Sequence, residues 1–204
     1  NSVNVGNLDV NAGNTAINTL TGAVAVDGIT VDGDGTTNIV AATNIESDGT
    51  IQNNAGAMAL QAGNNISVTG SLENTGAGLS VDAGGLTVSG TMKNDSDGVL
   101  RINADSWTIN GGSTAEFSFV NSGDLYATVS GQTYMEYGMN LDTMGQGNTF
   151  SLDTGTLVFG SDADLQAWGN VFANSLNSFN LVVRQGNLDL NTAILNGANG
   201  NLGA

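Results

Sequence analysis

The chain repeats one phrase three times: Thr50-Ile51-Gln52-Asn53, Ser71-Leu72-Glu73-Asn74 and Thr91-Met92-Lys93-Asn94. The copies begin 21 and 20 residues apart (50 to 71 and 71 to 91), and each is followed by two short alternating apolar runs that end in Gly. A repeat of this length with strand-like alternation is typical of a solenoid, in which one short motif stacks on itself. The sequence therefore predicts a repetitive architecture and not a compact globular enzyme fold.

The period extends outward from this centre and places apolar residues in columns. Each coil is predicted to hold three short strands with inward residues at positions i and i+2, and with Ser, Thr, Asp, Asn and Gln between them. Parallel strands without helical spacers must be connected by winding, so we predict an all-β fold, a right-handed parallel β-helix with coils of about 21 residues. The columns are Val3, Val24, Ile45, Ile66, Leu86 and Trp107; Leu8, Ile29, Ile51, Leu72 and Met92; and Ile39, Leu60, Val81 and Ile102.

Three asparagines share the inward parity of the apolar residues that precede them. Asn53, Asn74 and Asn94 follow Ile51, Leu72 and Met92 by two residues. Stacked at the strand spacing of ~4.7 Å, each side-chain amide can donate to the carbonyl of the next. We therefore expect a structural Asn ladder inside the coil, and a ligand-binding role for these residues has little support.

A column of glycines closes one strand of successive coils. We expect the chain to turn a corner at these positions, where glycine permits a positive φ. The column consists of Gly28, Gly49, Gly70, Gly90 and Gly111.

The regularity changes near residue 112. We interpret residues 1–112 as regular β-helix coils and residues 113–204 as a less regular, aromatic-richer continuation of the same β-helix. An insertion or second subdomain around Gln132 to Gly147 is the alternative. Near the C-terminus, Gly186-Asn187-Leu188-Asp189 repeats Gly6-Asn7-Leu8-Asp9, which indicates that the stack continues.

The composition excludes several classes of partner and site. Lys and Arg number 3 against 19 Asp and Glu, for a net charge of −16, which repels nucleic acid and anionic membrane faces. No apolar run approaches the ~18 residues of a membrane-spanning helix, so we expect no membrane insertion in this segment. With no Cys and no His, the chain lacks disulfides, thiolate metal sites and the usual general base.

Two turns carry paired carboxylates. Asp32 and Asp34 alternate with glycines, and Asp95 and Asp97 stand in Asp95-Ser96-Asp97-Gly98. Such turns suit a hard cation with oxygen ligands, so these four residues are candidate calcium ligands. A plain acidic turn is the competing interpretation, because Asp and Gly are the residues that turns prefer, and no other cofactor is expected.

A catalytic β-helix would need carboxylates on adjacent coils of one face, together with basic or aromatic residues for a sugar. Asp82 and Asn103 share a column with Gln61, and Asp105 lies nearby. The bases are Lys93, Arg101 and Arg184, and Trp107 stands in an inward column. We therefore predict no catalytic residues and no enzyme activity.

The Gly-, Asn- and Thr-rich coils, with phrases such as Asp48-Gly49-Thr50-Ile51-Gln52-Asn53 and Gly70-Ser71-Leu72-Glu73-Asn74, resemble the repeat shafts of filamentous-haemagglutinin-like exoproteins and autotransporter passenger domains. The resemblance covers Val3 to Gly112 and rests on period and composition. It implies an extracellular location on a bacterial cell surface and a role in adhesion or matrix building. It supplies no catalytic residues.

Neither end of the sequence shows a segment able to cover a terminal coil, so we expect copies to stack end to end or the chain to be cut from a longer fibre. The resulting hypothesis is a structural surface fibre or adhesin shaft that self-associates, with surface glycans or proteins of other cells as further partners. The alternative is a carbohydrate-binding or carbohydrate-cleaving β-helix. Ice or mineral binding by a flat Thr face is weaker, because the outward columns mix Ser, Asp, Gln and Arg.

Overall fold

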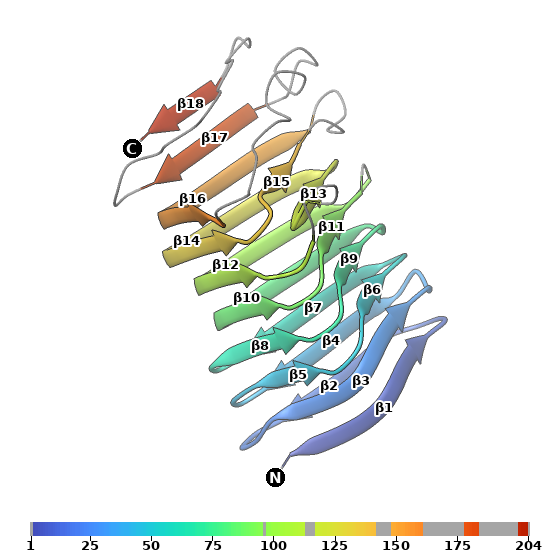
Figure 1. The fold of residues 1–204 in the computed structure, drawn as a ribbon. Coiled ribbons are helices and arrows are strands. Elements are labelled where there is room, and N and C mark those ends of the chain that lie inside the picture. The colour runs from blue at the N-terminus through green and yellow to red at the C-terminus, as the bar shows by residue number, and fades with distance from the viewer. Residues whose placement is uncertain are drawn as a thin grey trace.

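A computed structural model describes residues 2–95, 97–112, 117–141, 148–160, 178–183 and 200–203. Within these residues the chain is all-β, without helix, and its strands pair in parallel to form a β-solenoid with turns of about 21 residues (Figure 1). The predicted fold class is confirmed, and the right hand of the winding stays a prediction. The strands are β1 (Val3–Val10), β2 (Thr15–Thr19), β3 (Val24–Val31), β4 (Thr36–Ala41), β5 (Ile45–Ser47), β6 (Ile51–Asn53), β7 (Ala57–Ala62), β8 (Asn65–Val68), β9 (Leu72–Asn74), β10 (Gly78–Val88), β11 (Met92–Asn94), β12 (Val99–Ile109), β13 (Phe119–Asn121), β14 (Asp124–Met135), β15 (Met139–Asn140), β16 (Thr149–Phe159), β17 (Ser178–Val183) and β18 (Gly200–Gly203).

Three faces run along the solenoid axis. The first contains the start of β1 and β3, then β5, β8 and the ends of β10, β12, β14 and β16. The second contains the ends of β1 and β3, then β6, β9, β11, β13 and β15. The third contains β2, β4, β7, and the starts of β10, β12, β14 and β16, followed by β17 and β18. Long strands such as β10 and β12 cross from the third face of one turn to the first face of the next (Figure 1).

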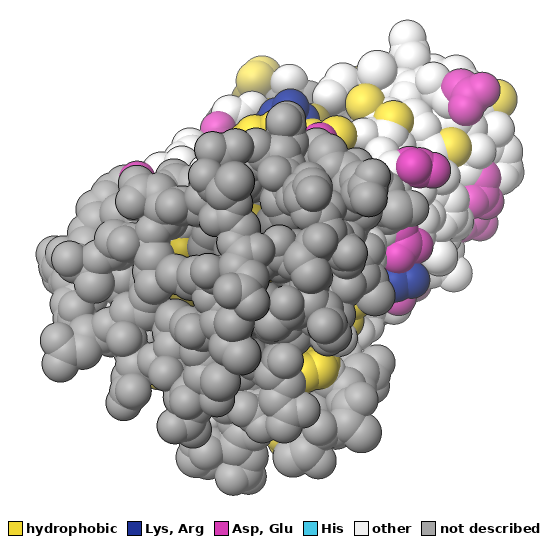
Figure 2. Space-filling model, turned by 90° about the horizontal axis from the view of Figure 1, so that it is seen from above, with side chains coloured by type: hydrophobic (Ala, Val, Ile, Leu, Met, Phe, Trp, Pro, Cys, Tyr) yellow, Lys and Arg dark blue, Asp and Glu magenta, His cyan; other side chains and the backbone are white. Residues whose placement is uncertain are grey.

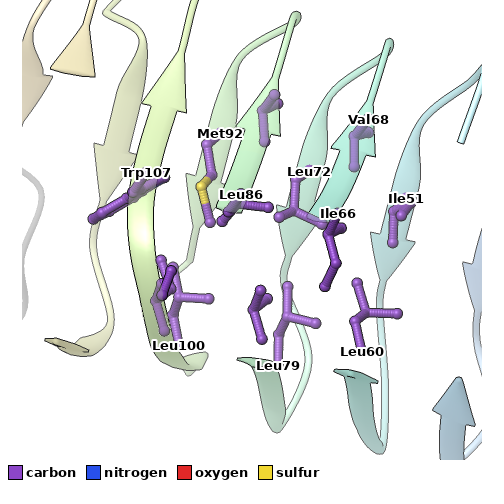
Figure 3. Packing of buried hydrophobic residues seen from close by; sticks show 14 of the residues in the cluster. Ile51, Leu60, Ile66, Val68, Leu72, Leu79, Leu86, Met92, Leu100 and Trp107 are labelled. Atoms are coloured by element: carbon purple, nitrogen blue, oxygen red, sulfur yellow. The ribbon is translucent and has the colours of Figure 1, made fainter. Parts of the chain in front are cut away.

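The register confirms the predicted columns. Val24 pairs with Ile45, Ile45 with Ile66, and Leu86 with both Ile66 and Trp107. From the second turn onward, the side chains of these columns are almost completely buried and follow one another along the axis inside the stack (Figure 3). Burial of each Ile or Leu contributes about 1.5–3 kcal/mol, so the same stabilisation is repeated at every turn.

The glycine column has a different cause from the one expected. Among the described residues, positive φ angles occur at Gly13, Gly56, Gly112 and Gly138, outside the predicted column. At Gly111 a Cβ would lie 2.1 Å from the carbonyl carbon of Gly90 in the preceding turn. At Gly49, Gly70, Gly90 and Gly111 a Cβ would lie within 2.7 Å of backbone atoms of the preceding turn, whereas at Gly28 the nearest atom would be the Thr50 carbonyl oxygen at 3.2 Å. Four of the five positions therefore require glycine because the backbones of successive turns approach closely, and the positive φ that we expected occurs at none of the five.

The coils widen beyond residue 112. Trp107 pairs with Thr133, a spacing of 26 residues (133 − 107), and the register of β12 with β14 shifts between Ala104 and Trp107. Phe119 fills part of the wider interior and meets Trp107 edge to face with ring centroids 5.4 Å apart. Strands β14 to β18 continue the same stack by parallel pairing. The division at residue 112 remains an interpretation.

The segment proposed as an insertion is partly described. Gln132 belongs to β14, Met139 belongs to β15, and residues 142–147 lie outside the described part. Met135 and Met139 are fully buried, whereas Tyr134 and Tyr137 are half-buried. The large side chains of this segment therefore serve in part to fill the interior. The C-terminal Gly186-Asn187-Leu188-Asp189 also lies outside the described residues.

Candidate functional site

The Asn ladder lies inside the corner that ends the second face. The Nδ2 atoms of Asn53, Asn74 and Asn94 each donate to the Oδ1 atom of the next asparagine at 2.8 Å. The last acceptor is Asn121, which the sequence analysis missed because its coil is 27 residues long instead of about 21. A signal was available, since Phe119-Val120-Asn121 repeats the large apolar–any–Asn pattern of Met92-Lys93-Asn94. All four side chains are fully buried, which fits a structural role.

The ladder has an unsatisfied end. Asn53 Oδ1 is buried and lacks a hydrogen-bond partner. It faces the preceding turn, where Val31 occupies the position in register with Asn53 and offers no donor. A buried amide oxygen without a partner costs about 1–3 kcal/mol, so this end is a local weakness of the fold.

The first acidic turn forms a shallow basin. Asp32 and Asp34 line a depression of about 450 Å³ with Asn11, Gly13 and the backbone between them. Asp32 Oδ1 already accepts a hydrogen bond from Asn54 Nδ2 at 2.7 Å. Two carboxylates are fewer than the 6–8 oxygen ligands that Ca²⁺ takes, so backbone carbonyls and water would have to supply the rest. Calcium binding at this turn stays a prediction.

The second acidic turn is less suited to bind a cation. Asp95 forms an ion pair with Lys93, at 3.0 Å between Oδ1 and Nζ, and Asp97 is exposed. Ser96 between them lies outside the described residues. Across the part of the chain that the structure describes, no three acidic, His or Cys residues gather at one point.

The residues considered for carbohydrate cleavage lie on the outer side of the third face. Gln61, Asp82 and Asn103 stand in register, and Asp82 Oδ1 accepts a hydrogen bond from Asn103 Nδ2 at 3.0 Å. Asp105 accepts from Ser130 Oγ at 2.7 Å. All of these side chains are exposed, and each carboxylate is engaged by a neutral partner. Trp107 is fully buried, as its inward column predicted.

A second feature of the third face was not singled out from the sequence. The outward residues Asn38, Ala59, Ser80, Arg101 and Tyr126 follow one another in register from turn to turn. Because Ala59 and Ser80 are small, the surface forms a depression between Asn38 and Arg101. We call this depression of about 200 Å³ the notch; it is lined by Thr36, Asn38, Ala57, Met58, Ala59, Gly78, Leu79, Ser80 and Arg101.

The Arg101 side chain at the edge of the notch stacks on the ring of Tyr126. The Arg101 guanidinium carbon lies 5.1 Å from the centroid of the Tyr126 ring. In the described part of the chain, Lys93 forms an ion pair, whereas no carboxylate lies within ion-pair distance of Arg101. Figure 2 shows a cationic area (blue) near the upper edge, beside hydrophobic (yellow) and acidic (magenta) side chains, and a second cationic area among the acidic side chains of the right flank.

One titratable group on the first face is perturbed. The Tyr134 hydroxyl donates a hydrogen bond to the Glu136 carboxylate. This hydrogen bond, with smaller contributions from desolvation and the nearby negative charge, raises the pKa of Tyr134 above its usual value of 10.0. Tyr137 also contributes to the raised pKa, so a second phenol lies near this pair.

Comparison with known proteins gives no match among protein families, curated proteins or solved structures. In the described residues no helix has the length and apolar character needed to cross a membrane. The architecture and the outward columns are therefore the basis for a functional proposal.

Proposed function

We propose that this chain is a structural segment of an extracellular bacterial surface fibre or adhesin shaft, and that it associates end to end with copies of itself. In this role the stack of turns provides length and stiffness, and the chain has no catalytic part. The extracellular bacterial location is the part of the proposal that depends on the resemblance of Val3 to Gly112 to the shafts of filamentous-haemagglutinin-like and autotransporter proteins.

The observation that carries the proposal is the incomplete burial of the apolar residues in the first turn. Val24, Val26 and Ile29 in the second turn are 0%, 3% and 1% exposed, whereas Val3, Val5 and Leu8, which stand in register with them, are half-buried. The same apolar columns therefore continue into the first described turn, where their side chains are less buried than in the second turn and present apolar surface to a further turn.

The backbone of the first turn also presents strand edges with which a second copy could pair. Among the described strands, β1 is paired with β3 on one side and β2 with β4 on one side, so their other edges are free to accept hydrogen bonds and donate them. An exposed edge of a long parallel strand is a template for another strand. Backbone pairing and burial of the apolar columns would act together when a second copy adds a turn.

The test is sedimentation velocity and negative-stain electron microscopy of the purified chain over a range of concentrations. We expect rods that lengthen as the concentration rises. Val5→Lys places a charge on the open apolar end and should leave monomeric rods, because desolvating a lysine opposes stacking.

Asn4→Lys is the matched control, since Asn4 is the neighbouring outward residue of the same strand. It adds the same charge without occupying the apolar end and should still lengthen. Circular dichroism checks that both variants keep the β-fold. Strictly monomeric wild-type rods at every concentration, or equal loss in both variants, would contradict end-to-end stacking.

A further inference from the structure

We propose that the notch on the third face binds a carboxylate-bearing sugar unit, of the uronic acid kind, within an extended acidic polysaccharide. This inference does not depend on end-to-end stacking, because the notch lies on the side of the solenoid between β4 and β12. It assigns an interaction to a surface that is separate from the terminal turn.

Arg101 supplies the charge that selects the ligand. Its guanidinium is exposed, has no carboxylate within ion-pair distance among the described residues, and is held over Tyr126. Asp82, on the diagonal neighbour position, is instead bonded to Asn103. The stacked guanidinium keeps its N–H groups available in a fixed fork, which matches the two oxygens of a carboxylate.

The shape of the notch favours one unit of a longer ligand. Asn38 and Arg101 are three turns apart in one column, or about 14 Å at the spacing of parallel strands. A volume of about 200 Å³ is below the range of about 300–1,000 Å³ typical of pockets that enclose a whole small molecule. A ligand held here therefore extends beyond the notch along the flat face.

The residues that line the notch favour an acidic polysaccharide over a nucleic acid as the ligand. The floor consists of Ala57, Ala59 and Gly78, which can lie against the apolar C–H face of a sugar ring, and Asn38 and Ser80 can bond to hydroxyl groups. A nucleic acid would bring closely spaced phosphates toward Asp82, and one arginine would neutralise few of them. A single carboxylate on a neutral, hydroxyl-rich ring matches one arginine among amides and hydroxyls.

The experiment measures binding of a galacturonic acid tetrasaccharide at a protein concentration where the chain is monomeric and at a low salt concentration of about 0.01 M. Arg101→Gln should weaken binding by roughly tenfold or more, the factor expected for loss of a charge-assisted hydrogen bond. Ala59→Tyr, which fills the notch and leaves the charge, should weaken binding to a similar extent. Lys93→Gln, which removes the other described cation, should leave binding within roughly twofold.

A second readout reports the site directly. In a proton–nitrogen correlation spectrum the chain gives two Arg Nε–H signals, from Arg101 and Arg184. The tetrasaccharide should shift the signal that Arg101→Lys removes. The fully methyl-esterified tetrasaccharide, which has the same rings without the charges, should shift neither.

Three results would overturn the proposal: no binding, equal loss in Lys93→Gln and Arg101→Gln, or equal binding of the ester. Equal binding of a hexaglutamate peptide or of a heparin fragment would show that the notch selects charge and not a uronic acid ring, and would also overturn it.

Discussion

At the scale of single residues, the Asn ladder shows how a polar side chain is accommodated inside an apolar stack. Asn74 and Asn94 each have a donor on one side and an acceptor on the other, so the oxygen that faces the preceding turn and the amide that faces the next are both satisfied. Asn53 lacks a partner for its oxygen because the preceding turn supplies Val31. The ladder is thus stable in its middle and weak at its first residue.

This weakness predicts an unusual effect of Val31→Thr. A threonine in the core normally costs about 1–3 kcal/mol, because its hydroxyl is buried without a partner. At position 31 the hydroxyl can donate to Asn53 Oδ1, so we expect the cost to be at least ~1 kcal/mol smaller than for Val88→Thr. Val88 is the control because it is equally buried, between Val68 and Ile109. Urea unfolding of both variants measures the difference, and equal costs would show that Asn53 Oδ1 is not reached.

A second prediction at this scale concerns pH. Because the hydrogen bond to Glu136 raises the pKa of Tyr134, the folded state holds this proton more tightly than the unfolded state. The stabilising contribution is therefore complete below the unfolded pKa of about 10 and is lost as the pH rises through the higher folded pKa.

Absorbance titration of the tyrosinates, with Tyr134→Phe as the subtraction control, should show this late titration. Glu136→Gln should move it back toward the usual pKa. An unchanged titration in Glu136→Gln would contradict the role of the carboxylate.

At the scale of elements, the turns between strands are determined by contact between successive coils. At Gly70 a Cβ would lie 2.6 Å from both the carbonyl carbon of Gly49 and the amide nitrogen of Thr50. Both are backbone atoms of the preceding turn and cannot move without shifting the whole coil. Glycine at this corner thus sets how closely two turns can stack.

We therefore expect Gly70→Ala to lower the free energy of unfolding by about 1–3 kcal/mol through overpacking. Gly78→Ala is the matched control, because the only atom near its Cβ would be the Val99 carbonyl oxygen at 3.8 Å. That variant should be neutral or gain about 0.4–1 kcal/mol, since alanine restricts the unfolded chain. Denaturant unfolding followed by circular dichroism distinguishes the two, and similar values would show that the corner can relax.

At the scale of the whole molecule, charge and end-to-end contact oppose each other. A net charge of −16 makes two copies repel, whereas the open apolar columns of the first turn favour contact. Raising the salt concentration from about 0.01 M to 0.15 M shortens the Debye length from about 30 Å to 8 Å and screens this repulsion. The balance between the two forces therefore depends on ionic strength.

We expect the same rise in salt to lengthen the rods in sedimentation velocity and to weaken binding of the galacturonic acid tetrasaccharide to the notch. The two effects have opposite signs because stacking brings like charges together, whereas the notch joins a cation to an anion. Rods that shorten with salt would indicate that attraction between charges holds the copies together, contrary to the proposed apolar contact.

The sequence by itself determined the all-β solenoid, the inward columns and the first three members of the Asn ladder. This was possible because the turns from Val3 to Trp107 repeat the same alternation at spacings of 20 to 22 residues, so residues in contact are also residues at a nearly fixed separation. Only the tertiary structure decided which residues meet across coils of variable length and how closely the backbones of neighbouring turns approach. Asn121 joins Asn94 across 27 residues, and Tyr126 meets Arg101 across 25 (126 − 101), because the wider coils changed the separation without changing the stack. The notch arises from small residues of two turns between larger neighbours, a surface shape that the inward period does not encode.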